Sequence, residues 1–72
     1  MNLTQAQLGV QYLVQTICTE DEELNGFLLT LGCYSGQPIT VVSQSRGGYV
    51  ISVKDGRYNI DKDLAEAILI SE

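Results

Sequence analysis

The sequence contains no histidine and no tryptophan among its 72 residues. Histidine is the side chain that titrates near neutral pH at its ordinary pKa, and it is the commonest ligand of transition metals. Aromatic side chains, tryptophan among them, line the grooves of domains that bind proline-rich peptides. We therefore assign no catalytic and no cofactor-binding residue, and we expect neither an enzyme nor a domain that binds proline-rich peptides.

Basic residues are also scarce, with four Lys and Arg against nine Asp and Glu, and the net charge is −5. Proteins that bind nucleic acids or anionic lipid surfaces need clustered basic side chains. The four bases of this chain are too few to form such a cluster. We therefore expect no nucleic acid as a partner.

Long apolar runs are missing as well, since none approaches the roughly 18–20 residues that span a bilayer. The first nine residues, MNLTQAQLG, lack the basic start and apolar middle of a secretion signal. The two cysteines are fewer than a small secreted domain usually carries. We expect one domain over residues 1–72, cytoplasmic and without direct membrane insertion.

The cysteines themselves, Cys18 and Cys33, are 15 positions apart and form no CxxC motif. This spacing is a poor signature for a metal site, so we assign no metal ligand. Cys33 is interpreted as a small apolar residue at a corner between a helix and a strand. The alternative is that both thiols join the carboxylates of residues 20–23 around a metal ion.

A helix is predicted over residues 19–31, with Thr19 as its N-cap and Glu22 completing a capping box. Its apolar face has the spacing i, i+3, i+4, i+7. Gly32 follows directly, where a left-handed residue commonly ends a helix. The four residues of the apolar face are Leu24, Phe27, Leu28 and Leu31.

Residues 10–17, rich in β-branched and aromatic types, are predicted to form the first strand. Residues 3–9 are expected to lead into this strand, with Leu3 and Leu8 packed against the small barrel that the strands are expected to form. Three tyrosines are expected to be half-buried in strands with their hydroxyls at the surface. They are Tyr12, Tyr49 and Tyr58.

The second half of the sequence predicts short β segments separated by turns. Asp55-Gly56 is a strong hairpin signal of the type I′ kind. Asp61 is expected to cap a short helical turn over 62–67. The predicted strands cover residues 38–44, 49–54, 57–60 and 68–70. The fold class is thus mainly β with one α-helix, a small SH3-like barrel of about five strands.

The order and spacing of these pieces resemble the ferrous-iron transport protein A (FeoA) family. The resemblance runs through Leu24, Leu28, Leu31-Gly32 and Gly36, then ITVV and GGYVISVKDGRYNIDKDLAEAILI. It implies a cytosolic accessory module that binds a membrane ferrous-iron transporter with its own cytosolic GTPase domain. The alternative function is a small sensor that binds ferrous ion through Cys18, Cys33 and nearby carboxylates. A third hypothesis is a small barrel that binds nucleic acid.

A partner surface is predicted on the side of the helix that carries Leu29. At 100° per residue Leu29 lies well away from Leu24, so it is expected to be exposed. Exposed apolar and aromatic residues are enriched at the centres of interfaces. We therefore assign Asn25, Leu29 and Tyr34 to partner binding.

Overall fold

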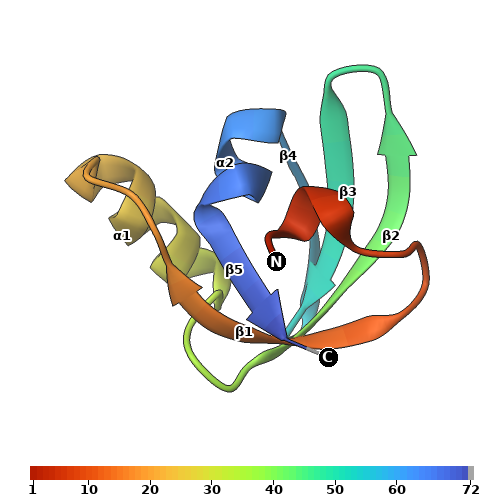
Figure 1. The fold of residues 1–72 in the computed structure, drawn as a ribbon, viewed down its shortest axis with the longest axis horizontal. Helices are drawn as coiled ribbons and strands as arrows, with labels where there is room; N and C mark the ends of the chain where they lie inside the picture. The colour runs from red at the N-terminus through yellow and green to blue at the C-terminus, as the bar shows by residue number, and fades with distance from the viewer. Residues whose placement is uncertain (72) are drawn as a thin grey trace.

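The computed structural model describes residues 1–71 and contains one five-stranded antiparallel sheet (Figure 1). The strands lie in the order β4-β3-β2-β1-β5. Register shifts between Val41 and Ser43 in β2, and between Val14 and Thr16 in β1, mark β-bulges. Such bulges bend a strand and increase its twist. The elements are η1 (Leu3–Gln5, a 3₁₀ turn), β1 (Gln11–Ile17), α1 (Glu22–Leu31), β2 (Pro38–Ser45), β3 (Gly48–Val53), β4 (Gly56–Ile60), α2 (Lys62–Ala67) and β5 (Ile68–Ser71).

The predicted strands and their order are confirmed, and the expected helical turn over 62–67 is a second α-helix. Asp61 caps α2 as predicted, because its carboxylate accepts a hydrogen bond from the N–H of Leu64 at 2.9 Å. The short α2 leads directly into β5. It thereby places the last strand beside β1.

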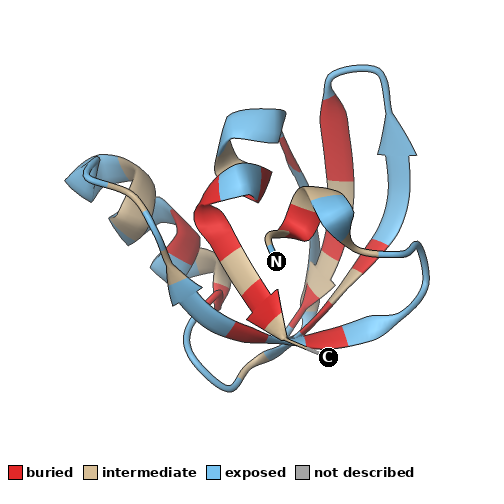
Figure 2. Cartoon of the chain, viewed as in Figure 1, coloured by how far each residue is buried: buried red, intermediate tan, exposed pale blue. Residues whose placement is uncertain are grey.

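A single apolar core lies inside the curved sheet (Figure 2). Side chains of β1, β2 and β3 enter it at alternating positions, as expected for a sheet with one buried face. Helix α2 contributes two alanines, and η1 contributes Leu3, which is fully buried. The largest fully buried side chains are Leu3, Leu28, Ile39, Ile51, Ile60, Ile68 and Ile70.

The segment before β1 packs only in part as predicted. Leu3 is buried, but Leu8 is 55% exposed, so the expected packing of Leu8 is wrong. The chain turns at Gly9, whose φ is +80° and whose N–H donates to the carbonyl of Val41. This turn leaves Leu8 on the outside.

The N-terminal residues also occupy the free side of β5. The N–H of Ile70 donates to the carbonyl of Met1 at 2.8 Å. Asn2 forms an isolated antiparallel bridge with Leu69. These contacts place the start of the chain beside its last strand (Figure 1).

Helix α1 begins later than predicted, and its N-cap is Asp21 and not Thr19. The Asp21 carboxylate accepts hydrogen bonds from the N–H groups of Glu23 and Leu24. The Thr19 hydroxyl instead accepts from the N–H of Asp21. Asp21 satisfies two N–H groups of the first turn, which is the physical reason that the helix begins after it.

The predicted apolar face of α1 is narrower than expected. Leu28 is fully buried, and Leu24 and Leu31 are partly buried, but Phe27 is 49% exposed. The prediction for Phe27 is therefore wrong. Figure 1 shows α1 standing at one side of the sheet. Leu28 is the one residue of this helix that is buried.

The β3–β4 hairpin turns one residue earlier than predicted. Val53 pairs with Gly56, so the two turn residues are Lys54 and Asp55 and not Asp55-Gly56. Lys54 adopts the positive φ, at +53°. The pairing of the strands, with apolar side chains of β3 facing the core, sets this register.

Two of the three tyrosines are more deeply buried than expected. Tyr12 is 4% exposed and Tyr49 is 8% exposed, so half-burial is wrong for both. Tyr58, on the outermost strand β4, is partly buried as predicted. Tyr12 and Tyr49 lie on strands that have a neighbour on each side, where the core covers their rings.

Candidate docking surface

A pocket of about 240 Å³ lies between α1, the end of β1 and the loop that follows α1. We call it the α1 pocket. It brings together all three residues predicted to bind a partner, although binding itself stays a prediction. Its lining residues are Thr16, Ile17, Asn25, Leu29, Cys33, Tyr34 and Ser35.

Helix α1 supplies one wall of the α1 pocket through Asn25 and Leu29. Residues four positions apart lie on the same face of a helix, one turn above the other. Leu29 is 45% exposed, which confirms its predicted exposure, and Asn25 is partly buried. The helix therefore presents a leucine and an amide beside the buried stripe that Leu28 occupies.

The loop after α1 places Tyr34 at the edge of the pocket. Gly32 has φ +106° and ends the helix, as predicted. The N–H of Cys33 donates to the carbonyl of Leu28 at 3.0 Å. Further along, the N–H of Gly36 donates to the carbonyl of Val14 at 2.8 Å, so the loop is tied to β1. Tyr34, between these anchors, is 39% exposed.

Cys33 contributes an uncharged thiol to the α1 pocket. Its side chain is fully buried, and burial raises the pKa of the thiol to about 11. A thiolate is the reactive and metal-binding form of cysteine, so this thiol is inert near neutral pH. The other six lining residues also carry no charge. The pocket is thus neutral although the chain is strongly acidic.

Lys54 lies beside this pocket, a neighbour that sequence reasoning missed. Its ammonium nitrogen is 5.2 Å from the centroid of the Tyr34 ring, within the range of a cation–π contact. The Tyr34 hydroxyl is the largest cause that raises the pKa of Lys54. Hairpin patterns in the sequence give no signal for a contact between this turn and the loop after α1.

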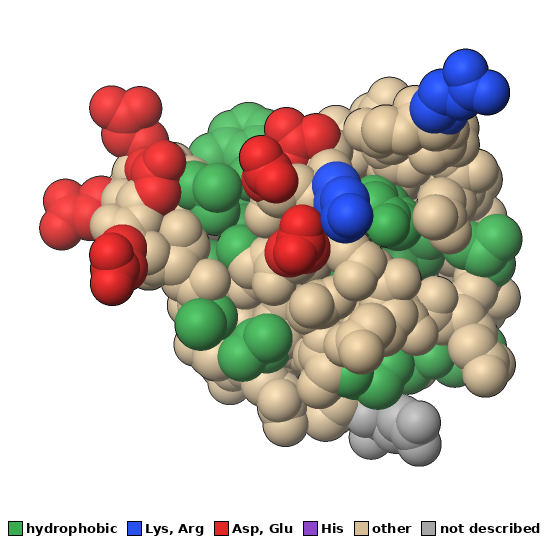
Figure 3. All heavy atoms as spheres, turned by 45° about the horizontal axis from the view of Figure 1, so that its top comes forward, with side chains coloured by type: hydrophobic (Ala, Val, Ile, Leu, Met, Phe, Trp, Pro, Cys, Tyr) green, Lys and Arg blue, Asp and Glu red, His purple; other side chains and the backbone are tan. Residues whose placement is uncertain are grey.

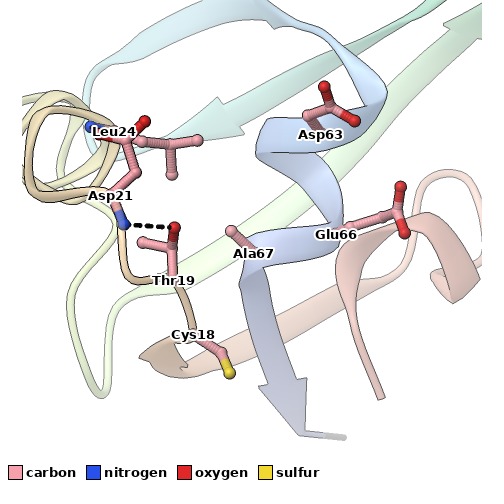
Figure 4. Close-up of a pocket in the computed structure, with 7 residues that line it drawn as sticks. All are labelled: Cys18, Thr19, Asp21, Leu24, Asp63, Glu66 and Ala67. Carbon is pink, nitrogen blue, oxygen red and sulfur yellow. Dashed lines mark hydrogen bonds between the residues drawn. The ribbon is translucent and has the colours of Figure 1, made fainter.

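A second pocket, of about 380 Å³, lies between the start of α1 and α2. Its lining includes Cys18, Asp21, Asp63 and Glu66. Figure 4 shows these side chains pointing in different directions. Acidic side chains gather on this face of the molecule, some near the start of α1 and others over α2 (Figure 3).

The two thiols of the alternative metal hypothesis do not come together. Cys18 is exposed and lines the second pocket, whereas Cys33 is buried and lines the α1 pocket. Asp21, within the acidic run, uses its carboxylate to cap α1. Within residues 1–71, no three His, Cys, Asp or Glu side chains are placed to hold a metal ion.

The sheet order, with one helix between the first two strands and a short helix before the last, defines a small SH3-like domain. The FeoA domain family matches residues 1–72. The chain belongs to the FeoA family, which is associated with ferrous-iron transport. No match was found among curated proteins.

Solved structures share this fold at low sequence identity. Zinc-complexed FeoA from Stenotrophomonas maltophilia is 16% identical, with a TM-score of 0.88 over 99% of this chain and 89% of that protein. A FeoA described as an iron uptake regulatory protein is 24% identical, with a TM-score of 0.84 over 97% and 93% of the two chains. A manganese-dependent transcriptional repressor is 15% identical, with a TM-score of 0.88, and the match covers 97% of this chain but 40% of the repressor.

Neither helix within the described part of the chain has the length and apolar character needed to cross a membrane.

Proposed function

We propose that this chain is a non-enzymatic accessory module that binds the cytosolic part of a ferrous-iron transporter. Membership of the FeoA family supports the link to ferrous-iron transport. The transporter, with its cytosolic GTPase domain, is the partner that the family resemblance implies. The contact surface is the α1 pocket with its rim residues Asn25, Leu29 and Tyr34.

The observation that carries this proposal is the meeting of Leu29 and Tyr34 at one neutral pocket. Both side chains are more than a third exposed, so their apolar surface is not buried in the core. Fully burying a leucine contributes about 1.5–3 kcal/mol, so covering the exposed part of Leu29 favours association. Aromatic and apolar anchors in pockets dominate the binding energy of many interfaces.

The test is binding of the transporter's purified cytosolic GTPase domain by the Leu29→Asp variant. A carboxylate buried in the interface without a partner is strongly unfavourable, so we expect affinity to fall at least about tenfold. Isothermal titration measures the affinity. Thermal unfolding of the variant is expected to resemble that of the unaltered chain, because Leu29 lies outside the core.

Two matched controls place the same charge on other exposed side chains. Leu8→Asp lies on the turn before β1, and Phe27→Asp lies on another side of α1. We expect both to bind the GTPase domain as the unaltered chain does. Full binding by Leu29→Asp, or an equal loss in all three variants, would contradict the proposed surface.

A further inference from the structure

We infer that Lys54 belongs to the docking surface and that the partner presents a carboxylate to it, beside an apolar side chain that enters the α1 pocket. This inference rests on the proposed function and names the chemistry of the partner. It is carried by the position of Lys54, by the neutrality of the pocket and by the distribution of charge over the chain.

The side chain of Lys54 is held against the end of α1. A Cβ atom added at Gly32 would lie 2.8 Å from Cδ of Lys54 and 3.0 Å from its Cγ. The aliphatic stem therefore lies directly on the glycine that ends the helix. Because the stem is packed there, the ammonium group is directed to the Tyr34 side of the pocket.

The backbone of Lys54 is also unusual. Among residues 1–71 it is the one non-glycine residue with positive φ. This left-handed conformation is unfavourable for a residue with a Cβ atom. Glycine or asparagine would adopt the turn more easily. The turn thus carries a lysine at a conformational cost, and this lysine reaches the docking surface.

The ammonium group lies over the exposed Tyr34 ring and remains accessible to solvent. A cation held over a ring at the rim of a pocket can contact an anionic group of an arriving partner without moving. The ring of Tyr34 contacts this charge and also lines the neutral pocket. The surface therefore pairs one positive charge with one uncharged pocket.

Lys54 is the one basic residue described beside the α1 pocket. The other three bases lie on the β2–β3 turn, on β4 and at the start of α2, and none lines the α1 pocket. The acidic run of residues 20–23 lies at the opposite end of α1 from Gly32, about 15 Å away along a ten-residue helix. The Asp55 carboxylate, next to Lys54 in the turn, also acts on its ammonium group, but no acidic side chain lines the α1 pocket itself. Charge complementarity at this rim therefore favours a partner carboxylate.

The test compares charge variants in titrations with the same GTPase domain. Lys54→Glu is expected to weaken binding about tenfold at low salt, and Lys54→Arg is expected to retain binding. Lys54→Asn removes the charge but suits the left-handed turn, so it folds even where Lys54→Glu is destabilised. We expect it to weaken binding about threefold and to reduce the salt dependence of the affinity.

Lys62→Glu is the matched control, because Lys62 is an exposed lysine at the start of α2. We expect it to bind as the unaltered chain does. Equal losses in Lys62→Glu and Lys54→Glu would indicate only overall electrostatics and would overturn the inference. Tighter binding by Lys54→Glu, which indicates a basic partner, would overturn it too.

The same titrations separate this inference from the proposed function. If Leu29→Asp loses binding but Lys54→Glu and Lys54→Asn bind normally, the docking surface stands and the role of Lys54 is wrong. If the unaltered chain does not bind the GTPase domain, both proposals are wrong.

Discussion

The hydroxyl of Tyr12 accepts a hydrogen bond from the backbone N–H of Gln7 at 3.0 Å. The ring of Tyr12 is buried in the core, so its hydroxyl reaches outward to the segment between η1 and β1. This side-chain hydrogen bond holds the segment before β1 against the strand. Tyr12, expected to be half-buried with its hydroxyl at the surface, is buried and holds the preceding segment through this hydrogen bond.

Tyr12→Phe is expected to lower the free energy of unfolding by about 1 kcal/mol, since it leaves the Gln7 N–H without its partner. Chemical denaturation measures this change. Tyr58→Phe is the control, because Tyr58 is only partly buried on the outermost strand β4, and we expect a smaller effect. Equal changes in the two variants would show that the bond to Gln7 contributes nothing to stability.

Alanine substitution of two glycines, one inside α1 and one at its C-cap, is expected to change the stability of the fold in opposite directions. Gly26 is inside α1 and has no atom within 4 Å of an added Cβ, so Gly26→Ala is expected to stabilise the fold by about 0.5–1 kcal/mol. Gly32→Ala is expected to destabilise it by more than about 1 kcal/mol, because its φ is +106° and its Cβ would displace Lys54. Thermal unfolding of both variants checks the pair, and stabilisation by Gly32→Ala would contradict the described end of α1.

The buried thiol of Cys33 is expected to make the fold sensitive to alkaline pH. Burial raises its pKa from an ordinary 9.0 to about 11, so the folded state disfavours the thiolate. The stability is fully present below about pH 9 and is lost as the pH rises toward 11. At pH 10.5 the loss due to this group is about 2 kcal/mol.

Tyrosine and lysine side chains titrate in the same range, so the measurement is a difference between variants. Between pH 8 and pH 10.5, we expect Cys33→Ala to lose less stability than the unaltered chain. Cys18→Ala is the control, and we expect it to lose as much stability as the unaltered chain. Iodoacetamide is expected to modify the exposed Cys18 of the folded chain and to reach Cys33 only after unfolding. Rapid modification of Cys33 in the folded chain would show that the thiol is accessible.

Most of the fold could be predicted from the sequence because its signals are local. Strand segments carry β-branched and aromatic residues, Asp61 marks the start of α2, and Gly32 marks the end of α1. The errors in burial, at Leu8, Phe27, Tyr12 and Tyr49, depend on how the elements pack together. The errors in element bounds occurred where one signal competed with another. Thr19 and Asp21 are both good caps, and Asp21 satisfied two N–H groups. At the β3–β4 turn, strand register placed Lys54 and Asp55 in the turn despite the Asp55-Gly56 signal.

The candidate site could be predicted only as far as helical periodicity reaches. The angle between Leu29 and Leu24 predicted that Leu29 is exposed, and it is. The pocket, however, depends on how the end of β1 and the loop after α1 pack beside the helix. The contact between Lys54 and Tyr34 joins a hairpin turn to that loop, and no periodicity in either segment indicates it.

The pairing of Met1 and Asn2 with β5 has a consequence for aggregation. An uncovered strand can recruit a strand of another molecule and start a fibril. Because the carbonyl of Met1 already accepts the N–H of Ile70, and Asn2 bridges to Leu69, this end of the sheet is protected. Intermolecular growth would have to start at β4, where the charge of Arg57 opposes the stacking of identical chains.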